Sequence, residues 1–327
     1  MKRLIMPFFS AGCLFLAAGA AAQQKTAATA QSSNVASAGV TQSSNTVQAD
    51  AVIGPQKGAL IIVGGGKVGP EIWARFIELA GGPNANIVVI PTAGEDSALA
   101  TGKSFEKELL QDLGVAQVTV LHTRDLKVAN TESFVAPLKK ATGIWFPGGR
   151  QWKIADAYLH TLAEKEIKAV LTRGGVIGGT SAGATIQGSF LLRGDTKGNG
   201  ILEGDHVQGL DLIHHTAIDQ HILRRNRQFD LVGVIKAHPD LLGIGIDEST
   251  AIVVQKDTFE VVGNSYVAIY DIAHINEKQK SPTGEYSTDG PFYFLGRGQR
   301  FDLQQRKVIT TANRSAAVNA PRLSNDH

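Results

Sequence analysis

The sharpest chemical pattern in the sequence surrounds Ser181. Residues 178–184 are Gly-Gly-Thr-Ser-Ala-Gly-Ala and contain Gly-x-Ser-x-Gly, directly after an apolar stretch and before a segment that can form a short helix. This is the context of a nucleophile elbow, in which a serine sits on a strained turn between a strand and a helix and needs small neighbours. The pattern favours Ser181 as an acyl-transfer nucleophile and the N–H of Ala182 as an oxyanion donor. The alternative is a glycine-rich turn with an incidental serine, and the flanking strand argues against it.

A second glycine-rich turn, residues 146–151 with the sequence Phe-Pro-Gly-Gly-Arg-Gln, follows another apolar stretch. Open α/β sheets bind their ligands at the carboxyl ends of their strands, where both turns are expected to lie. The N–H of Gly149 is therefore the predicted second oxyanion donor.

A serine hydroxyl needs a base that removes its proton and a third group that orients that base. Among the downstream histidines, His221 completes Asp-Gln-His and precedes the cation-rich residues 224–227, Arg-Arg-Asn-Arg. His214 and His215 form a pair with no acid beside them, so His221 is the better candidate. Spacing alone leaves open whether His221 is a base or an ordinary surface or core histidine.

The glycine-rich residues 64–69, Gly-Gly-Gly-Lys-Val-Gly, match the loose pattern Gly-x-Gly-x-x-Gly of a nucleotide-binding loop. They lack the Gly-Lys-[Ser/Thr] ending of a phosphate loop, and no acidic residue ends the next strand, which runs into Pro91. We therefore expect these glycines to form a pocket wall. The sequence contains no His-Glu-x-x-His motif, calcium loop or paired His-x-His cluster, so neither a metal nor another cofactor is predicted.

Alternating strands and helices must position these residues. Continuous aliphatic stretches are typical of buried parallel strands, and the spacing of apolar residues between them indicates helices. Strands are predicted at residues 59–63, 87–90, 118–121, 143–146 and 175–178, and helices at 71–80, 104–113 and 152–172. Repeated β-α units imply right-handed crossovers and a doubly wound sheet.

The last third of the folded region has a different pattern. Short β-branched strands at 244–246, 251–254, 259–262 and 266–270 are typical of an antiparallel extension, and edge strands are expected at 292–295 and 308–311. The predicted fold class is α/β, with a doubly wound, mostly parallel sheet flanked by helices and an antiparallel C-terminal extension. No internal domain boundary is evident within residues 59–312.

The N-terminal residues 1–22 have the features of a secretory signal peptide. A basic start precedes an apolar run over residues 4–16, and Ala20-Ala21-Ala22 matches the Ala-x-Ala pattern of a signal-peptidase cleavage site. Pro7 and Ser10 interrupt the run of about 20 apolar residues that a stable membrane anchor needs. We therefore expect export to the periplasm or the medium.

Composition bounds the rest of the chain. Residues 23–58 are dominated by small and polar side chains and are predicted to be a disordered linker, while residues 313–327 form a polar tail. The only cysteine, Cys13, lies in the leader, so the mature chain can form neither a disulfide nor a cysteine nucleophile. The net charge is +2 for the whole chain and falls to zero without Lys2 and Arg3, so the sequence has no excess of positive charge that would indicate nucleic-acid binding.

Three motifs occur in the order and approximate spacing found in the cyanophycinase family of serine peptidases. They are Gly-Thr-Ser-Ala-Gly-Ala at 179–184, Asp-Gln-His at 219–221 and Gly-Ile-Gly-Ile-Asp-Glu at 243–248. The sequence resembles that family over about residues 58–271. The resemblance implies a class I glutamine-amidotransferase-like fold, possible homodimers, and Ser181 as nucleophile, His221 as base and Glu248 as the acid that orients His221.

The resemblance also implies a peptide substrate. The family cleaves cyanophycin, a polyaspartate whose side chains carry arginine, from its end and releases β-aspartyl-arginine dipeptides. The positions that match the family's substrate pocket are Gln151, Asp219, Gln220, Arg225 and Arg227. In that pocket Asp219 can pair with a substrate guanidinium, while the arginines hold carboxylates.

Two positions depart from the family pattern. Arg150 stands where the family has an aspartate, and Asp230 stands where a third pocket arginine is expected, three residues after Arg227. We expect Arg150 to reach into the gap left by the missing arginine and to bind substrate. If it does not, the exchange favours an isoaspartyl or α-aspartyl dipeptidase of the same fold, or a β-aspartyl peptide as substrate. A non-catalytic periplasmic binding protein is a further alternative, against which the presence of all three triad candidates argues.

Overall fold

The computed structural model of the chain describes residues 52–101, 103–278 and 290–310. The predicted signal peptide, most of the predicted linker and the predicted polar tail lie outside these residues. Among the described helices, none has the length and apolar character needed to cross a membrane.

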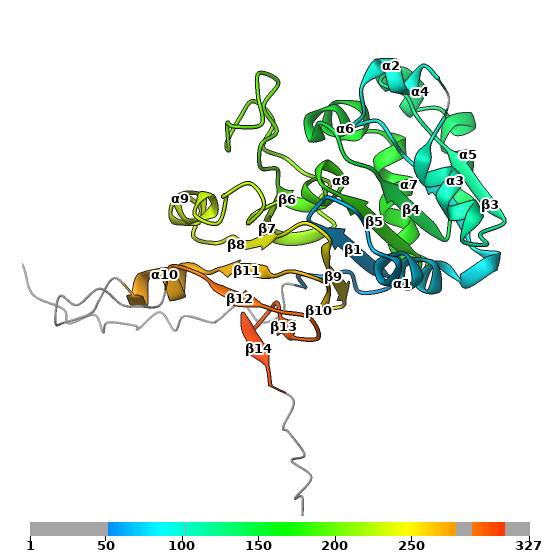
Figure 1. Cartoon of the computed structure of the whole chain (residues 1–327). Coiled ribbons are helices and arrows are strands. Elements are labelled where there is room, and N and C mark those ends of the chain that lie inside the picture. The colour runs from blue at the N-terminus through cyan, green and yellow to red at the C-terminus, as the bar shows by residue number, and fades with distance from the viewer. Residues whose placement is uncertain (1–51, 102, 279–289, 311–327) are drawn as a thin grey trace, which may run out of the picture. The chain divides into compact units, whose positions relative to one another are not determined.

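The larger sheet has nine strands in the order β14-β13-β10-β9-β1-β5-β4-β2-β3 (Figure 1). Its parallel part consists of β1 (Ala59–Val63), β5 (Val176–Thr180), β4 (Gly143–Phe146), β2 (Asn86–Val89) and β3 (Gln117–Val120). β1, β5 and β4 are direct neighbours, so the turns that follow them meet at one edge of the sheet. The predicted parallel, helix-flanked sheet is confirmed.

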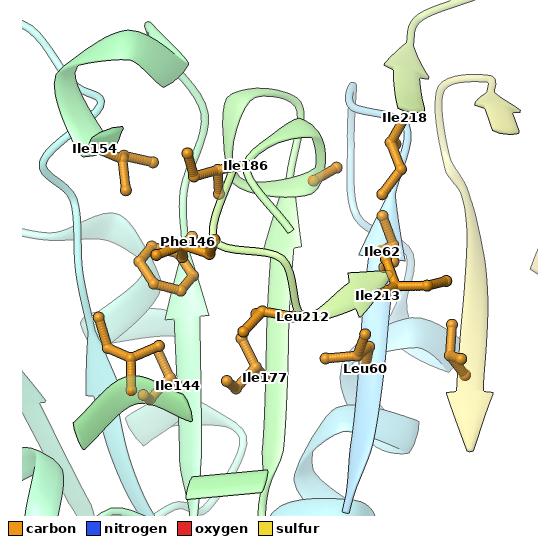
Figure 2. Packing of buried hydrophobic residues seen from close by; sticks show 14 of the residues in the cluster. Leu60, Ile62, Ile144, Phe146, Ile154, Ile177, Ile186, Leu212, Ile213 and Ile218 are labelled. Atoms are coloured by element: carbon orange, nitrogen blue, oxygen red, sulfur yellow. The ribbon is translucent and has the colours of Figure 1, made fainter. Parts of the chain in front are cut away.

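Helices cover both faces of this sheet because successive strand residues point to opposite sides. Leu60 and Ile62 of β1 belong to one apolar cluster, part of which Figure 2 shows, whereas Ile61 and Val63 belong to a second cluster. The first cluster includes residues from α5 (Glu132–Lys140), α6 (Gln151–Tyr158), α7 (Leu162–Thr172) and α8 (Ala182–Thr185). The second includes residues from α1 (Pro70–Ala80) and α3 (Phe105–Asp112). Short helical segments α2 (Asp96–Leu99), η1 (Gly82–Asn84) and α4 (Leu126–Ala129) lie in the connections.

The single helix predicted over residues 152–172 is wrong, because the chain forms two helices there. The helical conformation ends at Leu159, whose ψ is 138°, and His160 follows with a positive φ of 63°. The hydroxyl of Thr161 then accepts a hydrogen bond from the N–H of Glu164 and caps the start of α7. Apolar spacing continues across this break, which is why periodicity alone does not reveal it.

The predicted antiparallel extension is divided between two sheets. β9 (Thr250–Gln255) pairs antiparallel with β1, and β10 (Thr258–Gly263), β13 (Arg300–Asp302) and β14 (Lys307–Ile309) continue the same sheet. A second sheet has the order β12-β11-β8-β7-β6. In it β11 (Val267–Tyr270) and β12 (Tyr293–Leu295) pair antiparallel, as expected, and β12 and β14 are edge strands. Residue 311 of the last predicted strand lies outside the described residues.

The core of the second sheet corrects the prediction for its remaining strands. β8 (Leu242–Ile246) pairs parallel with β7 (Ile213–Gln220), which in turn pairs parallel with β6 (Gly188–Phe190). The sequence did not predict β7, whose residues Ile-His-His-Thr-Ala-Ile-Asp-Gln lack an aliphatic run. α9 (Asp230–Ala237) connects β7 to β8, and α10 (Ile272–Lys278) follows β11. β7 is the strand that carries Asp219 and Gln220 to the site.

Candidate active site

Ser181 directly follows β5 and has a backbone conformation that few residues other than glycine adopt. Its φ is 56° and its ψ is −110°, and its N–H donates a hydrogen bond to the carbonyl oxygen of Val63 at 3.1 Å. The flanking glycines make this turn possible, because a β-carbon at Gly183 would lie only 1.9 Å from the carbonyl oxygen of Phe146. The strand, strained serine and short helix α8 have the geometry of a nucleophile elbow.

Ser181, His221 and Glu248 form a continuous series of contacts. Ser181 Oγ lies 2.9 Å from His221 Nε2, and His221 Nδ1 lies 2.6 Å from Glu248 Oε1. The serine comes from the larger sheet, the histidine follows β7 of the second sheet, and the glutamate lies between β8 and β9. Tertiary structure therefore brings together three residues that are far apart in the sequence.

The glycines after β1 pack directly against His221 and Glu248. A β-carbon at Gly65 would lie 2.1 Å from His221 Cε1, and one at Gly66 would lie 2.8 Å from Glu248 Oε2. The carbonyl oxygen of Gly64 accepts a hydrogen bond from the N–H of His221 at 2.8 Å. The triple glycine is needed for close approach of the histidine and glutamate.

The surroundings of His221 favour its neutral form. Burial lowers the pKa of His221, and the positive charges of Arg225 and Arg227 lower it further, while the hydrogen bond to Glu248 opposes these effects. The net direction is downward from the ordinary value of 6.5. A neutral imidazole with its Nδ1 held by a carboxylate can accept a proton at Nε2 from Ser181.

Two backbone amides near Ser181 are available to bind an anion. Ala182 is the first residue of α8, so its N–H has no acceptor inside the helix. Gly149 has a φ of 140°, and the preceding Gly148 lies so close that its β-carbon would be 3.4 Å from that of Ser181. Within the described ranges neither the Ala182 nor the Gly149 amide donates a hydrogen bond.

Arg225 and Arg227 lie next to the base but differ in their contacts. Arg225 is exposed, and its side chain has no hydrogen-bond or ion-pair partner among the residues that the structure describes. The guanidinium of Arg227 donates to the backbone oxygen of Gln220 at 3.2 Å and to its Oε1 at 2.9 Å. Gln151 is buried and donates to the carbonyl oxygen of Leu192, while its own Oε1 has no partner.

The structure contradicts the expectation that Asp219 is open to a substrate guanidinium. Asp219 is 0% exposed, and Arg193 binds both of its carboxylate oxygens, at 2.8 Å and 2.9 Å. The expectation that Arg150 fills the gap at position 230 is also wrong. Arg150 donates to the backbone oxygen of Asp195, whereas the cation that contacts Asp230, at 2.6 Å, is Arg193.

Sequence reasoning missed Arg193 because no motif surrounds it. The only hint is a single arginine that ends the stretch Phe-Leu-Leu-Arg at residues 190–193. The structure also corrects the view of His214, whose Nδ1 lies 2.8 Å from the carboxylate of Asp211, three residues earlier. His214 is therefore a second histidine paired with an acid, but it is not among the contacts of Ser181.

The chain is similar to known peptidases over most of its length. Residues 60–262 match the model of peptidase family S51. The cyanophycinase of Nostoc sp. is 32% identical over 270 residues, covering 79% of this chain and 90% of that protein. The cyanophycinase of Synechococcus elongatus is 34% identical over 267 residues, covering 77% of this chain and 81% of that protein.

A solved structure shares the fold. The crystal structure of a peptidase from an acI-B1 actinobacterium superposes with a TM-score of 0.57 at 24% sequence identity, covering 76% of this chain and 98% of that one. The family match spans most of the described residues and includes Ser181, His221 and Glu248. The chain therefore belongs to peptidase family S51 and is a serine-type peptidase.

Proposed function

We propose that this chain is an exported exopeptidase that hydrolyses cyanophycin to β-aspartyl-arginine dipeptides, with Ser181, His221 and Glu248 as its catalytic triad. The observation that carries the proposal is the contact series from Ser181 Oγ through His221 to Glu248, at 2.9 Å and 2.6 Å. The cyanophycinases of Nostoc sp. and Synechococcus elongatus, which match most of the chain, support the choice of substrate.

In this mechanism Ser181 Oγ attacks the carbonyl carbon of the scissile peptide while His221 Nε2 takes the hydroxyl proton. The amides of Ala182 and Gly149 donate to the oxyanion of the tetrahedral intermediate. His221 then protonates the leaving amine, which departs and leaves an acyl ester on Ser181. A water molecule, deprotonated by His221, hydrolyses the ester, and Glu248 stabilises the imidazolium in both halves of the reaction.

Arg225 provides the charge that an aspartyl substrate requires. It is exposed, lies close enough to His221 for its charge to lower the pKa of that histidine, and has no side-chain partner in the part of the chain that the structure describes. A guanidinium binds a carboxylate through two parallel hydrogen bonds, so Arg225 can fix a free carboxylate of the polyaspartate beside the nucleophile.

A second candidate is an isoaspartyl or α-aspartyl dipeptidase. It is favoured by the pairing of Asp219 with Arg193, because this pairing removes the carboxylate that would recognise the arginine side chain of cyanophycin. The two functions are separated by incubating the protein with cyanophycin and, in parallel, with a panel of α- and β-aspartyl dipeptides. Release of β-aspartyl-arginine from the polymer supports cyanophycinase activity, whereas cleavage of dipeptides alone would replace it. A protein that binds these compounds without turnover would be a binding protein.

Export is part of the proposal and rests on the pattern of residues 1–22. The test is expression of the full chain in a Gram-negative host, followed by fractionation and mass determination of the mature protein. A periplasmic or extracellular product that begins at Gln23 supports export. A full-length product retained in the cytoplasm would contradict it.

Gly65→Ala is expected to lower kcat/KM by about 100-fold or more, because a displacement near 1 Å at a catalytic group has effects of that size. The new β-carbon would lie 2.1 Å from His221 Cε1, at a backbone φ of 111° that alanine rarely adopts. Gly69→Ala is the matched control in the same loop, since its β-carbon meets nothing within 4 Å. Equal activity of the two variants would show that Gly65 does not support the histidine.

The pH profile is expected to report the electrostatics of His221. The base must be neutral, so kcat/KM falls as the pH drops through its pKa, which lies below the ordinary value of 6.5. Arg225→Gln removes a positive charge that disfavours the imidazolium, so the pKa rises and the acid limb moves to higher pH. Arg224→Gln is the control, because Arg224 is also exposed but is not among the charges that shift the pKa of His221. An acid limb that stays in place in Arg225→Gln would contradict the assignment of the limb to His221.

A further inference from the structure

Arg193 lies at the centre of an ionic cluster that belongs to neither the triad nor the oxyanion site. Its side chain is 3% exposed, and its Nε and Nη2 bind the two carboxylate oxygens of Asp219 at 2.8 Å and 2.9 Å. Nη2 also binds Asp230 Oδ2 at 2.6 Å, and Nη1 donates to the carbonyl oxygen of Asn199 at 2.9 Å. The planar fork of an arginine is suited to hold two carboxylates at once, which a lysine could not do with the same geometry.

The cluster continues toward the catalytic base. Asp219 and Gln220 are the two residues that precede His221, and Arg227 lies 3.9 Å from Asp219 while it binds Gln220 Oε1 at 2.9 Å. Because Arg193 already binds both oxygens of Asp219, Arg227 is left to hold Gln220. Arg193 is thereby linked, through Asp219 and Arg227, to Gln220, which is one of the predicted substrate-binding residues.

The local backbone indicates that this arrangement is enforced by its contacts. Arg193 has a φ of 54°, a conformation that costs a non-glycine residue energy and persists only where the surroundings determine it. Its partners come from β7 and from the first turn of α9, 26 and 37 residues further along the chain. A buried carboxylate such as Asp219 requires a cationic partner, because an unpaired charge is strongly disfavoured away from water.

We propose that Arg193 is a positioning residue of the substrate site. It provides, beside Asp230, the guanidinium that the resemblance led us to expect at position 230 itself, and it keeps Asp219 paired inside the protein. The proposal deepens the proposed function and rests on it. Arg193 reaches the cluster from the connection after β6, whereas the resemblance led us to expect a pocket arginine at position 230 on α9. Since Asp219 is occupied, the site selects for substrate carboxylates, through Arg225, more than for a substrate guanidinium.

Arg193→Gln is expected to raise KM for the aspartyl substrate by about tenfold or more, with a smaller change in kcat. Without Arg193, the carboxylate of Asp219 attracts Arg227 away from Gln220, and the binding surface loses its shape while the triad keeps its contacts. Asp230→Arg alone places a second guanidinium beside Arg193 and is also expected to raise KM. The double variant Arg193→Gln/Asp230→Arg has a single guanidinium at one of these two positions, as the wild type does, and should return KM to within about threefold of the wild type.

Arg75→Gln is the matched control, because it removes an arginine from the exposed pair with Glu78 on α1 and should leave KM unchanged. An unchanged KM in Arg193→Gln would overturn the proposal. So would a lower KM in Asp230→Arg, which would mean that Arg193 does not supply the missing cation. If Arg193→Gln does not fold, the other two variants decide, and a folded double variant without recovery also overturns it.

A readout that needs no substrate separates this inference from the proposed function. A fluorophosphonate reacts with an activated serine, and the acid limb of its reaction with Ser181 follows the protonation of His221. The charged groups that face His221 are Glu248, Arg225 and Arg227. In Arg193→Gln the shift of Arg227 toward Asp219 weakens its repulsion of the imidazolium, so the limb should move to higher pH and return in the double variant. If the wild type reacts with the probe but cleaves no aspartyl peptide, the proposed function fails, and an unmoved limb would then overturn the role of Arg193.

Discussion

Ser181→Ala is expected to abolish hydrolysis, with a loss in kcat of about 10⁴-fold or more, as for other nucleophiles that act as one unit with their base. The substitution removes only the hydroxyl that lies 2.9 Å from His221 Nε2. Alanine keeps the β-carbon, so the turn at φ 56° carries the same strain as before and the fold should be retained. The residual rate in this variant comes from the oxyanion donors and substrate binding alone.

The measurement is kcat on cyanophycin or the best aspartyl peptide, together with fluorophosphonate labelling and the melting temperature. Ser133→Ala is the control, since Ser133 is an exposed serine on α5 whose hydroxyl donates to Thr131 Oγ1 and not to a catalytic residue. A Ser181→Ala protein with an unchanged melting temperature and near wild-type turnover would mean that the peptidase uses another nucleophile.

His221→Ala is expected to cause a loss of similar size, because the serine hydroxyl remains a poor nucleophile without a base. The imidazole is held between Ser181 Oγ and the carboxylate of Glu248, and its lowered pKa keeps it neutral near pH 7. Since the two residues act on the same proton, the double variant Ser181→Ala/His221→Ala should be about as slow as either single variant. An additive loss would indicate separate roles.

His214→Ala provides a matched control for this prediction. Its Nδ1 lies 2.8 Å from Asp211, much as that of His221 contacts Glu248, but its contacts do not include Ser181. We expect wild-type kcat and KM for this variant, measured in the same assay as His221→Ala. If His214→Ala were the slower of the two, the base would have been assigned to the wrong histidine.

Local features were predictable because they depend on neighbouring residues. The strands β1, β2 and β4 follow from continuous aliphatic runs, and the turn at Ser181 follows from the glycines two residues before and two residues after it. Gly179 is required by a contact within the same turn, because its β-carbon would lie 2.2 Å from the carbonyl oxygen of Gly183. The break at His160 was not predictable, because apolar spacing continues across it.

The candidate site was only partly predictable. The residues around Ser181 were enough to predict its strand-turn-helix unit, and the resemblance to the family indicated which histidine and glutamate belong with it. It could not determine which charges meet in the pocket, because the contact of Arg193 with Asp219 and Asp230 joins a connection, a strand and a helix with no shared periodicity. That Arg193, and not Arg150, reaches Asp230 is visible only in the folded chain, since the pairing of long charged side chains depends on where β7 and α9 lie and on how far each side chain extends.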